Sequence, residues 1–131
     1  MSLPLTPALE DRLTKGQTAW LGTVRPDGRP HVTPIWFVWD GVNAGVATQP
    51  RNQKVGNIEY EPRVNLALDD STRPVSLEAC GSVVVDFPQH VLEGFAEQHG
   101  WNLKGGGANT SLPSVNVLLR LEPSRWLMAD A

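Results

Sequence analysis

The sequence is short of cysteine and of charge. Its 131 residues include one cysteine, Cys80, which excludes an internal disulfide framework and a zinc site built mainly from thiolates. Charged residues make up 19% of the chain and the formal net charge is −3. An acidic chain whose aromatic residues are not interleaved with a basic stripe does not suit nucleic-acid binding. We therefore expect no nucleic-acid partner.

Long apolar runs are missing too, and so is a basic-then-apolar secretion signal. We expect no membrane partner and a cytoplasmic location. The length fits one domain over residues 1–131, and no linker or internal repeat divides it. The chain does contain five tryptophans. A small domain with few charges and many tryptophans is expected to hide part of its surface against a partner chain.

Segments with strand composition dominate the chain. Thr18–Val24 is followed by a Pro-Asp-Gly turn and by His31–Trp39, and Asp40-Gly41 signals a second hairpin that leads into Val42–Thr48. The other expected strands are Arg63–Leu68, Val75–Asp86, Val115–Glu122 and Arg125–Met128. The expected helices are Thr6–Lys15, Arg51–Glu61 and Pro88–His99. Because hairpins join most of the strands, we predict a mainly β fold, an antiparallel barrel or sandwich decorated with short helices.

Three smaller expectations concern single positions. Gly81 inside a strand suggests a bulge or a close backbone approach. Cys80 beside it is expected to be a small buried thiol. The glycine-rich stretch Gly100–Pro113 is expected to be a loop.

The histidines do not suggest a catalytic or metal site. None of His31, His90 and His99 has a carboxylate or a second histidine at a metal-ligand spacing. We therefore predict neither a catalytic side chain nor a metal ligand.

A phosphate site is better supported. Arg51 and Lys54 flank Asn52, the expected N-cap of a helix. Free backbone amides at the positive end of a helix dipole, together with two cations, suit a phosphate group. Thr48 just upstream adds a hydroxyl. The competing interpretation is two solvated surface cations.

The segment Thr33-Pro34-Ile35-Trp36-Phe37 is a second candidate. A proline inside a strand removes a ladder hydrogen bond and indicates an edge or a bulge. Such a strand leaves backbone groups free to meet a planar heterocycle, with Trp36 or Trp39 as a wall. The competing interpretation places the same aromatics in a barrel core and a dimer patch.

Four stretches together resemble a known family: the turn Pro26-Asp27-Gly28-Arg29-Pro30, then His31–Phe37, Thr48–Lys54, and Glu61-Pro62-Arg63-Val64. They are similar to the pyridoxamine 5'-phosphate oxidase-like FMN-binding split-barrel proteins, and closer to the branch that uses the deazaflavin coenzyme F420. The resemblance covers roughly residues 6–86. One departure is Gly56, where the family often has an arginine.

The resemblance implies a six-stranded antiparallel split β-barrel. It also implies a homodimer with cofactor sites at the subunit interface. Arg51 and Lys54 match the residues that hold the cofactor phosphate, and Thr48 matches a hydroxyl position at the same strand end. Residues Thr33–Phe37 match the strand that lies along the ring. The implied cofactor is F420, with FMN as the alternative.

The function that follows is an oxidoreductase that moves a hydride between F420 or FMN and a small organic acceptor. The cofactor would carry the chemistry, so no side chain needs to be a nucleophile or proton donor. The sequence leaves two alternatives open. One is a carrier that binds F420 or FMN without turnover, and the other is a split-barrel haem protein with His31, His90 or His99 as axial ligand.

Overall fold

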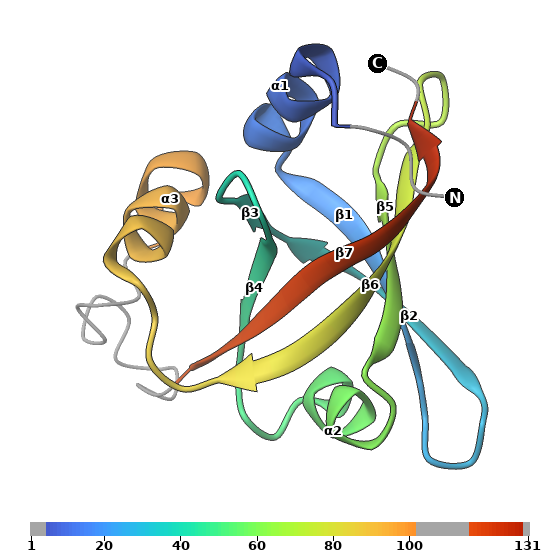
Figure 1. Ribbon diagram of the computed structural model, residues 1–131. Coiled ribbons are helices and arrows are strands. Elements are labelled where there is room, and N and C mark those ends of the chain that lie inside the picture. The colour runs from blue at the N-terminus through green and yellow to red at the C-terminus, as the bar shows by residue number, and fades with distance from the viewer. Residues whose placement is uncertain (1–4, 102–115, 130–131) are drawn as a thin grey trace.

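An antiparallel sheet of seven strands in the order β2-β1-β5-β6-β7-β4-β3 carries the fold (Figure 1). The computed structural model describes residues 5–101 and 116–129. The strands are β1 (Thr18–Val24), β2 (Pro30–Trp36), β3 (Val38–Trp39), β4 (Ala44–Thr48), β5 (Arg63–Leu68), β6 (Val75–Val84) and β7 (Val117–Ala129). Strands β2 and β3 stand at opposite ends of this order although only Phe37 separates them in the chain. The sheet therefore curls round into the predicted split barrel.

The predicted strand His31–Trp39 is divided at Phe37 into β2 and β3, and the sheet has seven strands where the family resemblance implied six. The Phe37 side chain is fully buried in the core, and its backbone N–H donates to Gln17 O at 3.2 Å rather than to a neighbouring strand. A Cβ on Gly16 would lie 2.8 Å from the Phe37 ring, so the chain packs tightly here. The two strands predicted near the C-terminus form one strand, β7, whose register against β6 shifts twice.

Helices α1 (Pro7–Lys15) and α2 (Gln53–Tyr60) lie at opposite ends of the barrel (Figure 1). Thr6 caps α1 by accepting from the Leu9 N–H, and Asn52 caps α2. Both helices bury an apolar face in the main core, with Leu9 and Leu13 from α1 and Val55 and Ile58 from α2.

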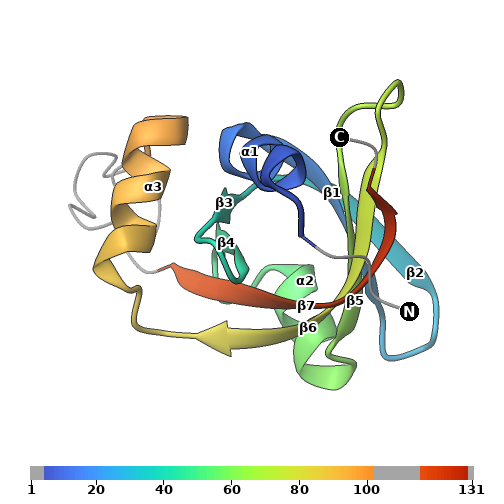
Figure 2. The same ribbon diagram turned by 45° about the horizontal axis from the view of Figure 1, so that its top comes forward.

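Helix α3 (Gln89–His99) lies outside the barrel against β3 and β4 (Figure 2). Its Val91 and Phe95 pack with Val38, Ala47 and Leu118 in a second cluster. Gly100, with φ 62°, ends the helix, and most of the predicted loop Gly100–Pro113 lies outside the described residues. Within residues 5–101 and 116–129, no helix is long and apolar enough to cross a bilayer.

Strand β6 confirms one expectation and overturns another. A Cβ on Gly81 would lie 3.1 Å from Ile58 Cγ2, so this glycine allows the predicted close approach, here of α2. Cys80, expected to be buried, is exposed. Side chains alternate along β6, and Ala79 and Gly81 take the inner positions, which turns the thiol outward.

A buried hydrogen bond fixes α2 to the sheet. Asn57 is fully buried, and its Nδ2 donates to Thr23 Oγ1 on β1 at 2.9 Å. Gln53 Nε2 donates to Asn57 Oδ1 at 2.7 Å from one turn earlier. These contacts set how the start of α2 faces the β1–β2 hairpin.

We expect Thr23→Val to lower the free energy of unfolding by about 1–3 kcal/mol, because the buried Asn57 Nδ2 loses its acceptor. Urea denaturation measures the change. Thr14→Val is the control, since the Thr14 hydroxyl is exposed on α1, and its effect should be small. Equal stabilities for wild type and Thr23→Val would show that this contact does not hold α2.

Candidate functional site

The predicted phosphate residues lie along the connection from β4 to α2. Lys54 is only 8% exposed although it carries an ammonium group. Its Nζ donates to Asn52 Oδ1 at 2.9 Å, and the same oxygen accepts the Lys54 backbone N–H at 3.3 Å. No carboxylate of the described residues forms an ion pair with Lys54. Burial lowers the pKa of Lys54, and no neighbouring charge among the described residues opposes this effect.

The two other predicted phosphate residues differ in exposure. Thr48 is buried at the end of β4, whereas Arg51 is exposed in the turn before α2. Arg51 also makes no ion pair with a described carboxylate. The connection therefore offers one buried and one exposed cation beside the first turn of a helix.

Residues Thr33–Phe37, which the resemblance places along the cofactor ring, point their side chains alternately to two sides. Ile35 and Phe37 are buried in the core, while Pro34 and Trp36 are exposed. Pro34, Ile35 and Trp36, together with Thr18 of β1, line an open groove of about 280 Å³. Backbone pairing places Thr18 opposite Trp36. The groove thus follows three of the five predicted residues.

Trp36 and Trp39 were both candidates for a side chain that borders a bound ring. Trp36 is accessible for this role and Trp39 is not. Trp36 is 50% exposed, and its ring stacks on His99 with centroids 5.0 Å apart. His99 Nε2 lies 2.9 Å from the carbonyl oxygen of Phe37, which ties the end of α3 to the chain beside Trp36. Trp39 is buried and contacts Trp126 edge-on in the core.

The structure also brings two residues to the site that the sequence analysis did not assign there. Arg25 follows β1, and His31 on β2 pairs in register with Thr23, the residue that accepts from Asn57 of α2. Arg25 Nε, His31 Nδ1 and Thr33 Oγ1 are all buried and have no hydrogen-bond partner among the described residues. Burial, followed by the charges of Arg25 and Lys54, lowers the pKa of His31. We call Arg25, His31, Thr33 and Lys54 the polar corner.

The alternation of side chains along a strand could have identified part of the polar corner from the sequence. His31, Thr33 and Ile35 share one face of β2 because side chains alternate along a strand. The buried Ile35 identifies that face as the inner one. The approach of α2 to this hairpin depends on Asn57 and Thr23, which no local pattern in the sequence reveals.

The remaining histidine, His90, pairs with an acidic residue. His90 lies at the start of α3, and its Nε2 is 3.5 Å from Asp40 Oδ2. Burial acts to raise the pKa of Asp40, but hydrogen bonds from the Asn43 and Val42 N–H groups, together with the contact to His90, hold the pKa below the ordinary value. In the part of the chain that the structure describes, no three His, Cys, Asp or Glu side chains gather as a metal site.

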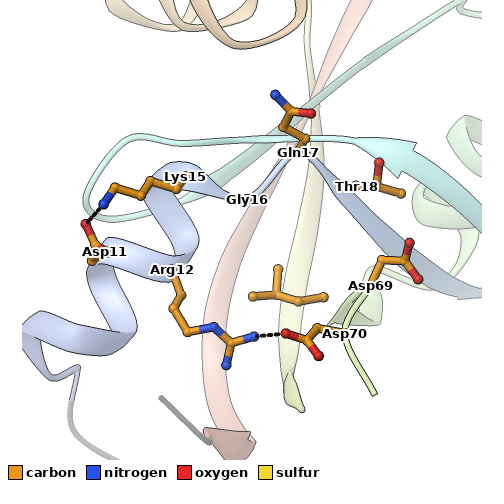
Figure 3. A pocket seen from close by; sticks show the side chains of 9 residues that line it. Asp11, Arg12, Lys15, Gly16, Gln17, Thr18, Asp69 and Asp70 are labelled. Atoms are coloured by element: carbon orange, nitrogen blue, oxygen red, sulfur yellow. Dashed lines mark hydrogen bonds and ion pairs between the residues drawn. The ribbon is translucent and has the colours of Figure 1, made fainter. Parts of the chain in front are cut away.

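A second hollow, of about 320 Å³, lies between α1 and the end of β5 (Figure 3). Its charges pair with one another, Arg12 with Asp70 at 3.2 Å and Lys15 with Asp11 at 3.1 Å. Asp69 accepts from the indole N–H of Trp20. Because these side chains are already paired, the hollow offers a ligand less uncompensated charge than the polar corner does.

Comparison with protein families matches residues 5–128 to the family described as "Pyridoxamine 5'-phosphate oxidase". The chain belongs to this family. The match spans both the β4–α2 connection and the β1–β2 hairpin. A search of curated proteins found no match.

Solved structures of this family's fold are similar over almost the whole chain. A protein titled "F420 Reductase" is 27% identical, with a TM-score of 0.68, and the match covers 89% of this chain and 94% of that one. A conserved hypothetical protein from Mycobacterium tuberculosis is 25% identical, with a TM-score of 0.74 and coverage of 95% and 84%. The haem storage protein HutZ from Vibrio cholerae is 22% identical, with a TM-score of 0.74 and coverage of 96% and 95%, and shares the fold.

We expect Lys54→Met to raise the free energy of unfolding of the ligand-free protein by about 0.5–1 kcal/mol. The substitution removes a buried charge that has no carboxylate partner among the described residues. The pKa of Lys54 is lower in the folded than in the unfolded chain, so the unfolded chain binds more protons between the two values. Wild-type stability should therefore rise with pH in that alkaline interval, and the variant should lack this rise.

Urea denaturation at neutral and alkaline pH measures both effects. Lys15→Met is the matched control because Lys15 is exposed and paired with Asp11. Marked destabilisation by Lys54→Met would show that the lysine is a structural residue.

Proposed function

We propose that the protein holds the phosphate of a flavin-type cofactor at the start of α2 and transfers a hydride between that cofactor and a small organic acceptor. The observation that carries the proposal is the buried Lys54, which has no carboxylate partner among the described residues and lies beside a helix N-terminus. An anionic ligand would compensate that charge and raise the lowered pKa of Lys54.

The proposed cofactor is F420, with FMN as the alternative. The similarity to a protein titled "F420 Reductase" supports F420. Both molecules have a phosphate on a chain attached to a planar tricyclic ring, and the proposal assigns the phosphate to the β4–α2 connection and the ring to residues Thr33–Phe37. When bound, the cofactor supplies the hydride chemistry.

Each part of the site has a distinct task in this proposal. Lys54 and Arg51 bind the phosphate at the positive end of the α2 dipole, and Thr48 adds a hydroxyl. The Thr33–Phe37 strand lies along the ring, and Trp36, held by its stack on His99, borders the groove. The protein binds and orients the cofactor and keeps water away from it.

The outer face of β1 and β2 supports a homodimer with cofactor sites at its interface. Trp20 pairs in register with Pro34, and Gly22 with Val32, so exposed apolar side chains gather on this face. Trp20, Val32 and Trp36 are 41%, 60% and 50% exposed. A second copy is the proposed cover, because Trp36 and Pro34 also line the groove.

We expect Val32→Asp to convert a dimer into a monomer, since a carboxylate on an apolar interface would lose its hydration. Light scattering during size-exclusion chromatography gives the mass. Val42→Asp is the control, because Val42 is 69% exposed in the β3–β4 turn, away from this face. A monomeric wild type, or a dimeric Val32→Asp protein, would contradict the proposal.

For cofactor binding, we expect Arg51→Ala with Lys54→Ala to weaken F420 and FMN affinity by about 100-fold or more, since each loses a charge-assisted hydrogen bond to phosphate. Cofactor fluorescence titration measures the affinity. Lys15→Ala with Arg73→Ala removes the same charge at exposed positions away from the β4–α2 connection and is the control. Wild-type affinity in the Arg51/Lys54 double variant would contradict the assignment.

Turnover is tested separately. Reduced F420 and reduced FMN are mixed with quinone-like, nitro and enone acceptors, and the cofactor absorbance is followed. Oxidation that depends on the protein and on an acceptor supports the enzyme, and tight binding without turnover favours the carrier. A Soret shift with haemin and no affinity for F420 or FMN would favour a haem protein.

A further inference from the structure

The polar corner contains more polar groups than the phosphate site predicted from sequence. Arg25 Nε, His31 Nδ1 and Thr33 Oγ1 come from one hairpin, and each is buried without a partner among the described residues. Buried polar atoms in folded proteins nearly always have a hydrogen-bond partner. Three such atoms at neighbouring positions of one hairpin indicate a place that a polar ligand completes.

The charges around His31 show which ligand fits. Arg25 from the end of β1 and Lys54 from α2 are the charged groups that act on its ring, and no carboxylate of the described residues does. Burial and these two cations favour the neutral imidazole. A phosphate anion placed among them would oppose both effects and favour the imidazolium.

We propose that His31 is a direct contact of the cofactor phosphate and takes up one proton when that phosphate binds, with Arg25 as a second cation on the same group. The inference rests on the proposed function for the identity of the ligand. The proton comes from solvent and adds to the unprotonated ring nitrogen. Both ring nitrogens then carry hydrogen, so Nδ1–H donates to a phosphate oxygen and Arg25 Nε–H donates beside it.

This contact couples affinity to pH. The protein with a bound phosphate anion holds up to one proton more than the free protein between the two pKa values of His31, so affinity should fall as pH rises, by up to about tenfold per pH unit. The phosphate monoester of FMN itself gains a proton near pH 6, whereas the phosphate diester of F420 stays singly charged. Sulfate remains a dianion throughout the range and is therefore the probe that reports on the protein alone.

The experiment measures the pKa of each histidine by NMR of the ring Cε1–H signals between about pH 5 and 9, in chloride and in sulfate at equal ionic strength. His31→Asn and His90→Asn assign the signals. In chloride, the pKa of His31 should lie below the ordinary value, as burial, Arg25 and Lys54 dictate. In sulfate the pKa of His31 should rise by about one unit or more, beyond any change in the signals of the other histidines.

Fluorescence titration of FMN and F420 across the same pH range is the second readout. His31→Asn keeps an amide N–H near the Nδ1 position but does not titrate, so its affinity should lose most of the pH dependence. His90→Asn is the matched control and should retain it, because His90 pairs with Asp40 at the start of α3. Riboflavin, which lacks the phosphate, should bind without this dependence.

The outcomes separate this inference from the proposed function. If F420 or FMN binds but the pKa of His31 is unchanged by sulfate and by the cofactor, the proton-linked contact is overturned and the cofactor site stands. If sulfate raises the pKa of His31 but neither cofactor binds, the anion contact stands and the cofactor assignment fails. An equal pKa change at all three histidines would indicate general ion screening and would also overturn the inference.

Discussion

The proposed site of this protein depends on one charge, the buried ammonium group of Lys54, which has no carboxylate partner among the described residues. Burial of a cation without a carboxylate partner disfavours the folded state, so a position of this kind indicates a ligand rather than a structural need. The fold holds the charge in place through Asn57, which fixes α2 to Thr23 of β1. The same contact brings α2 beside the hairpin that carries Arg25 and His31.

Much of the fold follows from local patterns. Strands Thr18–Val24 and Arg63–Leu68 have the predicted bounds, because turn residues flank both of them closely. Thr6 and Asn52 cap helices as their side chains allow. The break at Phe37 was not predicted, because this residue continues the apolar run in the sequence. The break depends on the hydrogen bond from the Phe37 N–H to Gln17, which is distant along the chain. The sequence also could not show that the two C-terminal strand segments are one strand that bends against β6.

The site was predicted less completely than the fold. Arg51 and Lys54 were found because a helix cap and two cations stand together in the sequence, although nothing there distinguishes the exposed Arg51 from the buried Lys54. Arg25 and His31 are remote from them along the chain and join the site only through the folded hairpin. The prediction for Cys80 was wrong. Its apolar neighbours suggested burial, but the alternation of side chains along β6 places it on the outside.

A crystal structure of the protein with bound F420 or FMN tests the central claim most directly. Lys54 Nζ should lie within hydrogen-bond distance, about 3 Å, of a phosphate oxygen at the start of α2. A cofactor whose phosphate lies elsewhere, with Lys54 still bonded only to Asn52, would contradict the account.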